Sequence, residues 1–278
     1  MTALGRTAFL FPCGRQWTSV LRSPPDQSRR MRLHLSTWQE VEAYLRTSTA
    51  ILIPIGSTEQ HGPTGLIGTD ALCPEIIGGL AADESGLLMA PTFNIGVAQH
   101  HMAFPGSMTL RPSTFIATMV DWVDSLAKHG FTHFYWLNGH GGNIATINAG
   151  FAEIYASRSL DTGNGRPPVK CRLRNWWDGK DTYAKCKELY GKAHGAHATP
   201  SEVAVTQYAY PDHIKSASLS PEIAPSGGFT DAKDYRARFP DGRIGSNPGL
   251  ATPEDGAAIA ELAARETVED FGRFASGG

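Results

Sequence analysis

Apolar residues occur along this chain either in short continuous runs or at helical spacing. Continuous runs are typical of strands that are covered on both faces, as in a parallel sheet. Such strands are predicted over residues 50–55, 87–90, 132–137 and 169–173. Apolar residues three and four positions apart predict helices that bury one face. These helices are predicted from residue 36 to 45, over 74–82, 113–129 and 144–158, after 199, and from 252 towards the C-terminus.

Strand, glycine-containing turn and helix follow one another twice, around residues 50–82 and 132–158. This order predicts an α/β domain with a mainly parallel sheet. The segment 211–250 is rich in Pro, Gly, Ser and Asp, so irregular surface structure is expected there. The length of 278 residues would allow two smaller domains, but one large domain, over residues 31–278, is the interpretation that we favour.

Residues 1–30 contain five arginines, no lysine and a single acidic residue, Asp26. This composition resembles a transit peptide, which is rich in arginine and poor in acids. The alternative that we favour is that Met31 is the physiological start and that the preceding residues are an over-extended reading frame. Either way, we expect a disordered or non-native leader.

The formal net charge of −2 gives no electrostatic footprint for nucleic acid or an anionic membrane. No apolar stretch approaches the roughly 20 residues needed to cross a bilayer. Four cysteines lie far apart without C-x-x-C spacing, which indicates neither a disulfide framework nor a thiolate zinc site. We therefore expect a cytoplasmic protein that acts on a small molecule.

The segment after the first predicted strand holds the densest group of potential metal ligands. Glu59 and His61 are two positions apart, so in extended backbone their side chains project to the same side. Asp70 follows a glycine-containing loop that can fold back towards the strand end. Asp70 could instead cap the helix that follows it. His140 comes just after another predicted strand, and ligands bind outside the carboxyl ends of parallel strands. The four residues together therefore predict a metal centre.

Two imidazoles and two carboxylates without a thiolate favour zinc, manganese or iron. A closed site of four ligands would serve stability, whereas a loop-built site at a sheet edge points to catalysis. In a catalytic site, metal-bound water can attack a carbonyl group.

Further candidates lie outside this cluster. His197 has no evident structural role, whereas Glu202 could simply form a capping box with Thr199. His101 and Trp177 could line a pocket. Each of the two could instead be an ordinary loop or packing residue.

Five segments carry a resemblance to a known family: IPIGSTEQHG with the following GTD, HMAFPGS, LNGHGGN, GAHATPSEV and GSNPGLATPEDG. Over nearly all of residues 31–278 the chain resembles the creatininase (creatinine amidohydrolase) family. The resemblance implies a three-layer α/β/α sandwich around a mainly parallel sheet. It also implies an amidohydrolase site with two divalent metal ions per subunit, zinc or manganese with iron as a further candidate, and a homo-oligomer, commonly a hexamer.

Carried over residue by residue, Glu59, Asp70 and His140 resemble the ligands of one ion, and His61 with a bridging Asp70 resembles those of the other. In the creatinine-hydrolysing members an aromatic residue and a metal-binding glutamate follow the NGH motif. Here these two positions are occupied by glycines, Gly141 and Gly142. Glu202 is the nearest candidate for the missing carboxylate.

The pocket also departs from the creatinine-hydrolysing members. Ala193 stands where those members have a gating tryptophan, while Trp177 matches the second pocket tryptophan. His101, Trp177 and Gly141 are expected to face the substrate. These departures argue against creatinine itself as the substrate.

The resulting hypothesis is an amidohydrolase that cleaves a cyclic or linear amide at a C–N bond other than a peptide bond. A hydroxide that bridges the two ions would attack the amide carbon, and His197 would pass a proton to the leaving nitrogen. The family also includes deformylating amidohydrolases and a peptide-processing peptidase. Two alternatives remain open: a non-catalytic, metal-stabilised binding protein, and a metal-dependent lactonase or isomerase.

Overall fold

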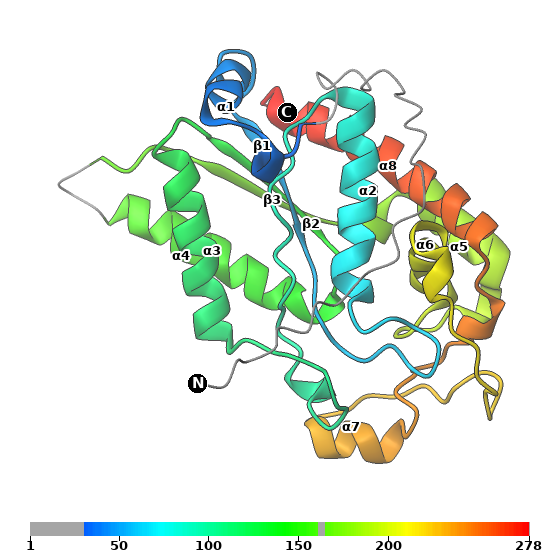
Figure 1. Cartoon of the computed structure of the whole chain (residues 1–278). Coiled ribbons are helices and arrows are strands. Elements are labelled where there is room, and N and C mark those ends of the chain that lie inside the picture. Colours follow the sequence, from blue (N-terminus) through cyan, green and yellow to red (C-terminus); the bar gives the residue numbers. More distant parts are fainter. Residues whose placement is uncertain (1–30, 161–164, 278) are drawn as a thin grey trace, which may run out of the picture.

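Three parallel strands form the centre of the computed structural model, which describes residues 31–160 and 165–277 (Figure 1). They are β1 (Ala50–Ile55), β2 (His133–Asn138) and β3 (Lys170–Asn175), in the order β1-β2-β3. Each strand pairs with its neighbour over six residues in register, so all three end at the same edge. The leader expected over residues 1–30 lies outside the described residues.

The predicted strand at 87–90 is replaced by isolated bridges beside β1. Leu52 N donates to Leu88 O at 3.0 Å, and Ala90 N donates to Leu52 O at 2.8 Å. The next donor in this ladder would be residue 54 of β1, which is a proline and has no N–H group. A regular fourth strand therefore cannot form, although the segment still lies along β1.

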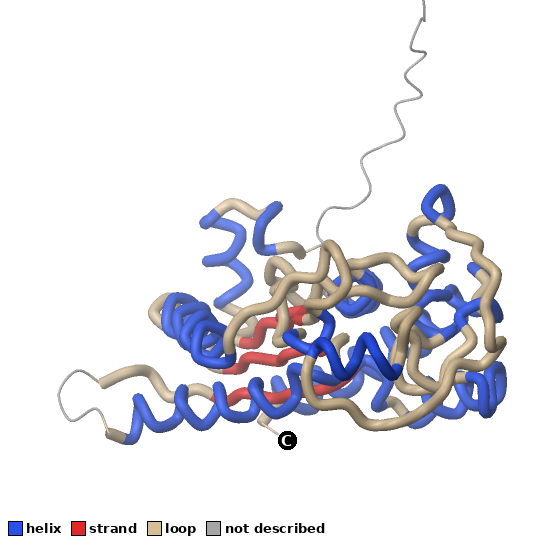
Figure 2. Tube along the Cα trace, turned by 90° about the horizontal axis from the view of Figure 1, so that it is seen from below, coloured by secondary structure: helices blue, strands red, loops and turns tan. Residues whose placement is uncertain are grey.

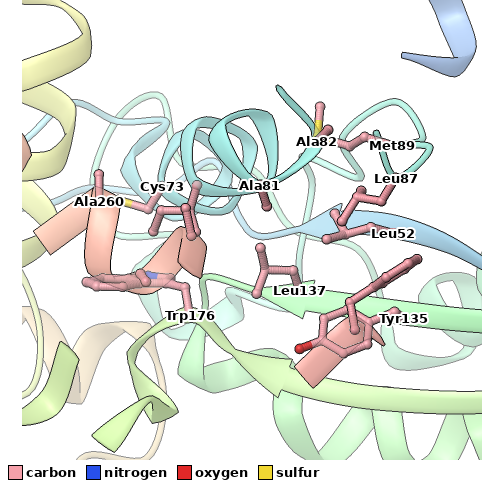
Figure 3. Close-up of a cluster of buried hydrophobic side chains, with 14 of the residues drawn as sticks. Leu52, Cys73, Ala81, Ala82, Leu87, Met89, Tyr135, Leu137, Trp176 and Ala260 are labelled. Atoms are coloured by element: carbon pink, nitrogen blue, oxygen red, sulfur yellow. The ribbon is translucent and has the colours of Figure 1, made fainter. Parts of the chain in front are cut away.

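Helices cover both faces of the sheet, as the predicted three-layer sandwich requires. One face carries Leu52 and Leu137, which pack against α2 (Thr69–Ser85) and α8 (Pro253–Ala275) in the apolar cluster of Figure 3. The other face carries Ile51, Ile53 and Trp136, which pack against α3 (Pro112–Ala127) and α4 (Ile144–Ser159). Figure 2 shows the strands enclosed by helices and loops. The prediction of fold class is confirmed.

Several helices differ from the prediction in their bounds or were not predicted. α2 begins at Thr69 rather than near residue 74, so Asp70 lies in its first turn and Gly68 is the N-cap. The region 211–250, expected to be irregular, contains α7 (Ala232–Arg238). The remaining helices are α1 (Trp38–Leu45), α5 (Lys180–Tyr190), which was not predicted, and α6 (Pro200–Ala209).

The first turn of α2 is held between the ends of β1 and β2. A β-carbon on Gly56 or on Gly139 would lie 2.0 Å from the carbonyl oxygen of Asp70, so only glycine permits this approach. Pro74, one turn along α2, has no N–H group that could bond to the same carbonyl. The two strand ends thus fix the backbone of Asp70, and with it the position of the Asp70 side chain.

The described part of the chain contains neither a helix suited to span a membrane nor a disulfide. None of its helices combines the length and apolarity needed to span a bilayer. Cys73, Cys171 and Cys186 are free thiols. Burial raises the pKa of the Cys73 thiol well above its ordinary value, so this thiol is protonated at neutral pH.

Candidate metal centre

The residues expected to bind metal converge at the carboxyl edge of the sheet. Glu59 and His61 follow β1, Asp70 lies in the first turn of α2, and His140 follows β2. All four side chains are buried. The parallel register brings the ends of β1 and β2 side by side, and this is why residues about 80 positions apart in sequence meet here.

One set of three ligand atoms comes from Glu59, Asp70 and His140. The Nδ1 atom of His140 lies 2.7 Å from Asp70 Oδ2 and 3.3 Å from Glu59 Oε1. One ligand atom from each of the three residues lies within 4.8 Å of the others, a spacing that a single cation can bridge.

A second set comes from His61, Asp70 and Glu202. The Nε2 atom of His61 lies 2.9 Å from Asp70 Oδ1 and 3.9 Å from Glu202 Oε1. Asp70 thus points one oxygen at each set, the arrangement of a bridging carboxylate. Glu202 also forms the capping box of α6, where its Oε1 atom accepts a hydrogen bond from Thr199 N at 2.6 Å. Glu202 therefore caps α6 and at the same time lies beside the second set of ligand candidates.

The ring nitrogens that face away from the centre are held by backbone carbonyls. His61 Nδ1 lies 3.0 Å from Glu59 O, and His140 Nε2 lies 3.2 Å from Val97 O. A carbonyl can only accept, so the hydrogen bonds assign a proton to each of these nitrogens. The opposite nitrogens then offer lone pairs to the centre. Such outer partners are the usual support of metal-binding imidazoles.

Three carboxylate oxygens of the centre lack hydrogen-bond partners. Both oxygens of Glu59 and the Oδ2 atom of Asp70 are buried and accept no hydrogen bond of good geometry within the described residues. Burial of unsatisfied carboxylate oxygens is costly, and a cation at each set would satisfy them. The donor set and its unpaired oxygens therefore fit a pair of divalent ions.

Positive charge is favoured on the two ligand histidines, His61 and His140. Burial alone would lower the pKa of both ligand histidines. The Asp70 carboxylate beside His61 outweighs that effect and raises the pKa of His61 to about 10. Glu59 and Asp70 likewise raise the pKa of His140 to about 9. In the absence of metal, protons on these rings thus supply the charge that cations would otherwise supply.

His197 presents its Nδ1 atom to the same centre. Its Nε2 atom lies 2.8 Å from Gln60 O, while Nδ1 lies 3.9 Å from Glu59 Oε1. Burial, together with the neighbouring rings of His61 and His101, holds the pKa of His197 well below its usual value. A neutral imidazole in this position can accept a proton before it donates one.

A cavity of about 320 Å³ opens beside the centre. Its lining includes six of the site residues that the sequence singled out, namely Asp70, His140, Gly141, Trp177, His197 and Glu202. It also includes residues that sequence reasoning missed, namely Tyr183, Cys186, His194 and Ser201. His194 Nε2 lies 2.8 Å from Ser201 Oγ. His194 directly precedes the GAHATPSEV segment, and Ser201 lies within it, next to Glu202. This proximity to the candidates in the segment was the signal available in the sequence.

His101 lies elsewhere than expected. It was predicted to face the substrate, but its side chain is buried and is not among the residues that line the cavity. Its Nε2 atom lies 3.0 Å from Glu59 Oε1, and its Nδ1 atom lies 2.9 Å from the side-chain nitrogen of Gln60. In the structure His101 therefore stands behind a metal-ligand candidate rather than in front of a substrate.

The two glycines after His140 have different surroundings. Gly141 borders open space at the cavity. A β-carbon on Gly142 would lie 2.4 Å from His140 Nε2 and 3.0 Å from Val97 O. The position at which the creatinine-hydrolysing members are expected to carry a ligand is thus closed to any side chain unless the His140 ring moves.

Comparison with known proteins shows to which family the chain belongs. A profile of the creatininase family, described as creatinine amidohydrolase, matches residues 34–271. The chain belongs to the creatininase family. A creatinine amidohydrolase of Pseudomonas putida is 29% identical over 160 residues, which are 55% of this chain and 60% of that enzyme. The matched part thus spans less than two thirds of that relative. The resemblance drawn from the five sequence segments is confirmed.

Other relatives match over more of the chain and carry different names. A mycofactocin precursor peptide peptidase of Mycobacterium ulcerans is 26% identical, with coverage of 83% of this chain and 88% of that protein. A 3-dehydro-scyllo-inosose hydrolase of Thermotoga maritima is also 26% identical, with coverage of 84% and 76%. The relatives therefore include a creatinine amidohydrolase, a peptide peptidase and an inosose hydrolase.

Solved structures of creatininases share the fold. A manganese creatininase superimposes with a TM-score of 0.76 at 23% identity, covering 88% of this chain and 98% of that one. A zinc–zinc form of a creatininase mutant superimposes with a TM-score of 0.73 at 22% identity, covering 87% and 98%.

Proposed function

We propose that this protein is a metal-dependent amidohydrolase with two divalent ions, zinc or manganese, in each chain. The observation that carries the proposal is the position of Asp70, which contributes one oxygen to each of two ligand sets at the edge of a cavity. A single structural ion would need only one of these sets. Membership of a hydrolase family supports the same reading, and it disfavours a non-catalytic binding protein.

The chain's own residues would divide the work as follows. Glu59, Asp70 and His140 would hold one ion, and His61, Asp70 and Glu202 the other. Bound there, the ions would act as Lewis acids that activate water and polarise a carbonyl group. His197 would take a proton at Nδ1 and return it to the leaving nitrogen. Trp177 and Gly141 would contact the substrate from the cavity wall.

The substrate that we propose is a small amide. The cavity volume of about 320 Å³ suits a small molecule, and no Lys or Arg side chain is among the described residues that line it. A neutral substrate therefore fits better than a strongly anionic one. A C–N bond other than a peptide bond remains the predicted target, and a cytoplasmic homo-oligomer, a hexamer by family resemblance, remains the predicted assembly.

The test combines metal analysis with a substrate panel. Purified protein would be analysed for metal, stripped with a chelator, reloaded with zinc or manganese, and assayed on cyclic amides, N-formyl compounds, linear amides, short peptides and lactones. We expect about two ions per chain and metal-dependent turnover of an amide. Turnover of lactones alone would favour the esterase-type alternative. Two tightly bound ions with ligand retention but no turnover would favour the binding protein.

A further inference from the structure

A buried glutamine lies between two of the metal-ligand candidates in sequence. Gln60 separates Glu59 from His61, and its side chain points into a network with His101, His197 and the loop at Gly242. We propose that Gln60 is a positioning residue that fixes which nitrogen of His101 and which nitrogen of His197 carries the proton. The catalytic consequence of this role rests on the proposed function; the proton positions themselves do not.

The orientation of the Gln60 amide is set by its neighbours. Gly62 N donates to Gln60 Oε1 at 2.9 Å, so the oxygen of the amide lies on that side. The nitrogen, Nε2, then lies 3.0 Å from Gly242 O and 2.9 Å from His101 Nδ1. The opposite orientation would set the amide oxygen against the Gly242 carbonyl and the amide nitrogen against the Gly62 N–H group.

The two protons of this amide nitrogen determine the state of His101. Gly242 O can only accept, and it takes one proton. His101 Nδ1 lies at hydrogen-bond distance from the other, so Nδ1 must be unprotonated in order to accept it. The proton of the His101 ring is therefore on Nε2, the nitrogen that lies 3.0 Å from Glu59 Oε1. Gln60 thereby places the protonated nitrogen of His101 beside a metal-ligand candidate, although without the alignment of a hydrogen bond.

The backbone oxygen of Gln60 determines the state of His197. The Nε2 atom of His197 lies 2.8 Å from this oxygen and 3.0 Å from the Gln60 amide nitrogen. A carbonyl oxygen can only accept, so His197 Nε2 carries a proton and donates it to Gln60 O. The lone pair of His197 is therefore on Nδ1, which faces the metal centre.

The surrounding loop closes tightly on the amide. A β-carbon on Gly242, where φ is +89°, would lie 1.8 Å from Gln60 Oε1. The hydroxyl of Tyr235 in α7 donates to Gly242 O at 2.8 Å and lies 3.4 Å from Gln60 Nε2. Gln60 is only 8% exposed. This packing confines the amide, so a single residue contacts two imidazoles in a fixed arrangement.

The direct test is nitrogen NMR of protein labelled with ¹⁵N at histidine. Zinc is diamagnetic, so the zinc-loaded enzyme and the metal-free chain can both be examined. The wild-type protein should show a protonated Nε2 and an unprotonated Nδ1 for both His101 and His197. Protonated Nδ1 in the neutral ring of His197 would overturn the proposal without any variant.

Two variants of similar size extend the test. Gln60→Met removes both hydrogen-bonding groups, and Gln60→Glu replaces the donor nitrogen with an acceptor. We expect each to change the ¹⁵N pattern of His101, whose Nδ1 atom loses its donor, while His197 keeps its backbone acceptor, Gln60 O. We also expect kcat to fall about 10- to 100-fold, the usual cost of losing an outer partner at a metal site, with KM within about twofold of wild type. Gln207→Met in α6, another buried glutamine, is the matched control and should alter neither quantity.

A purely structural role gives a different result. In that case the Gln60 variants would lower Tm, while the ¹⁵N pattern and the kcat of the folded, metal-replete protein would stay as in the wild type. If the wild-type enzyme hydrolyses no amide at all, the proposed function fails, but the ¹⁵N pattern still decides the role of Gln60. The two failures are therefore distinguishable.

Discussion

The two ligand sets of the metal centre are built in different ways. The set of Glu59, Asp70 and His140 is assembled beside the ends of β1 and β2: Glu59 and His140 follow these strands, and Asp70 lies in the first turn of α2, which the two strand ends hold. The second set shares Asp70 but depends on Glu202, which lies in α6 and whose oxygen also caps that helix. The first ion site therefore depends on the ends of the sheet strands. The second depends in addition on how α6 begins.

The largest effect is expected from Asp70→Asn, which changes both sets at once. Loss of the shared carboxylate should abolish binding of both ions and reduce turnover by more than the roughly 10²-fold that loss of an outer-shell partner can cost. Elemental analysis and steady-state assays measure the two effects. Asp121→Asn on the exposed side of α3 is a matched control. Retention of one full ion by Asp70→Asn would show that the two sets do not share this residue.

His197→Ala is expected to separate chemistry from metal binding. Removal of the proton-transferring ring should lower kcat by about 10²- to 10⁴-fold while the protein keeps two ions per chain. Single-turnover assays of the metal-replete variant provide the measurement. Unchanged turnover would remove His197 from the mechanism, and loss of an ion would make it a ligand instead.

Glu202→Gln should weaken the second ligand set and leave the first intact. The amide oxygen of glutamine can still cap α6, but it is a poor substitute for a carboxylate at a metal. We therefore expect metal content to fall from two ions towards one, with little change in Tm for the metal-free chain. If two ions remain, Glu202 acts only as the cap of α6.

Metal binding should release protons. His61 and His140 have pKa values raised to about 10 and about 9, so at pH 7.5 both rings carry an extra proton when metal is absent. Each must lose that proton in order to bind an ion, so zinc binding should release about two protons per chain. Affinity should therefore rise with pH until these pKa values are passed. Calorimetry in buffers of different ionisation enthalpy counts the protons, and a count of zero would contradict the ligand assignment.

The smallest effect is expected from Thr199→Ala, which removes the other half of the capping box. Loss of this N-cap should cost about 1 kcal/mol of stability, because the first turn of α6 loses one hydrogen bond. Metal content should stay at two, since the Glu202 carboxylate is intact. Chemical denaturation of the metal-free chain measures the first quantity. A fall in metal content would show that the cap and the second ion site cannot be separated.

The same division explains what could be read from the sequence. Glu59, His61 and His140 follow apolar runs that are recognisable as strands, and parallel pairing then brings them together without further information. Asp70 was placed after a glycine-containing loop and ahead of a helix predicted from residue 74, because the start of α2 depends on glycine contacts with two strand ends. The orientation of His101 follows from a hydrogen bond to Gln60, a residue 41 positions away. No local pattern contains that contact.

The helices that were missed show a similar limit. The start of α5 is capped by Glu266 of α8, whose carboxylate accepts from the N–H groups of Asp181 and Thr182 at 2.9 and 3.1 Å. A cap supplied from about 85 positions away leaves no signal near the helix itself. α7 is different, because Asp231 caps it locally and its oxygen accepts from Lys233 N and Asp234 N. That signal was present but lay in a segment whose composition indicated irregular structure.

The creatinine-hydrolysing members are expected to carry a metal-binding glutamate at the position of Gly142. The crowding at Gly142 determines how easily this chain could adopt the same arrangement. A glutamate at position 142 would place its β-carbon against the His140 ring, whose Nε2 atom is hydrogen-bonded to the carbonyl oxygen of Val97. An exchange of Gly142 for glutamate alone therefore cannot give the other ligand arrangement, because the His140 ring must shift first. If Glu202 binds metal as proposed, such a barrier makes this use of a carboxylate from α6 hard to reverse by single substitutions, whichever arrangement arose first.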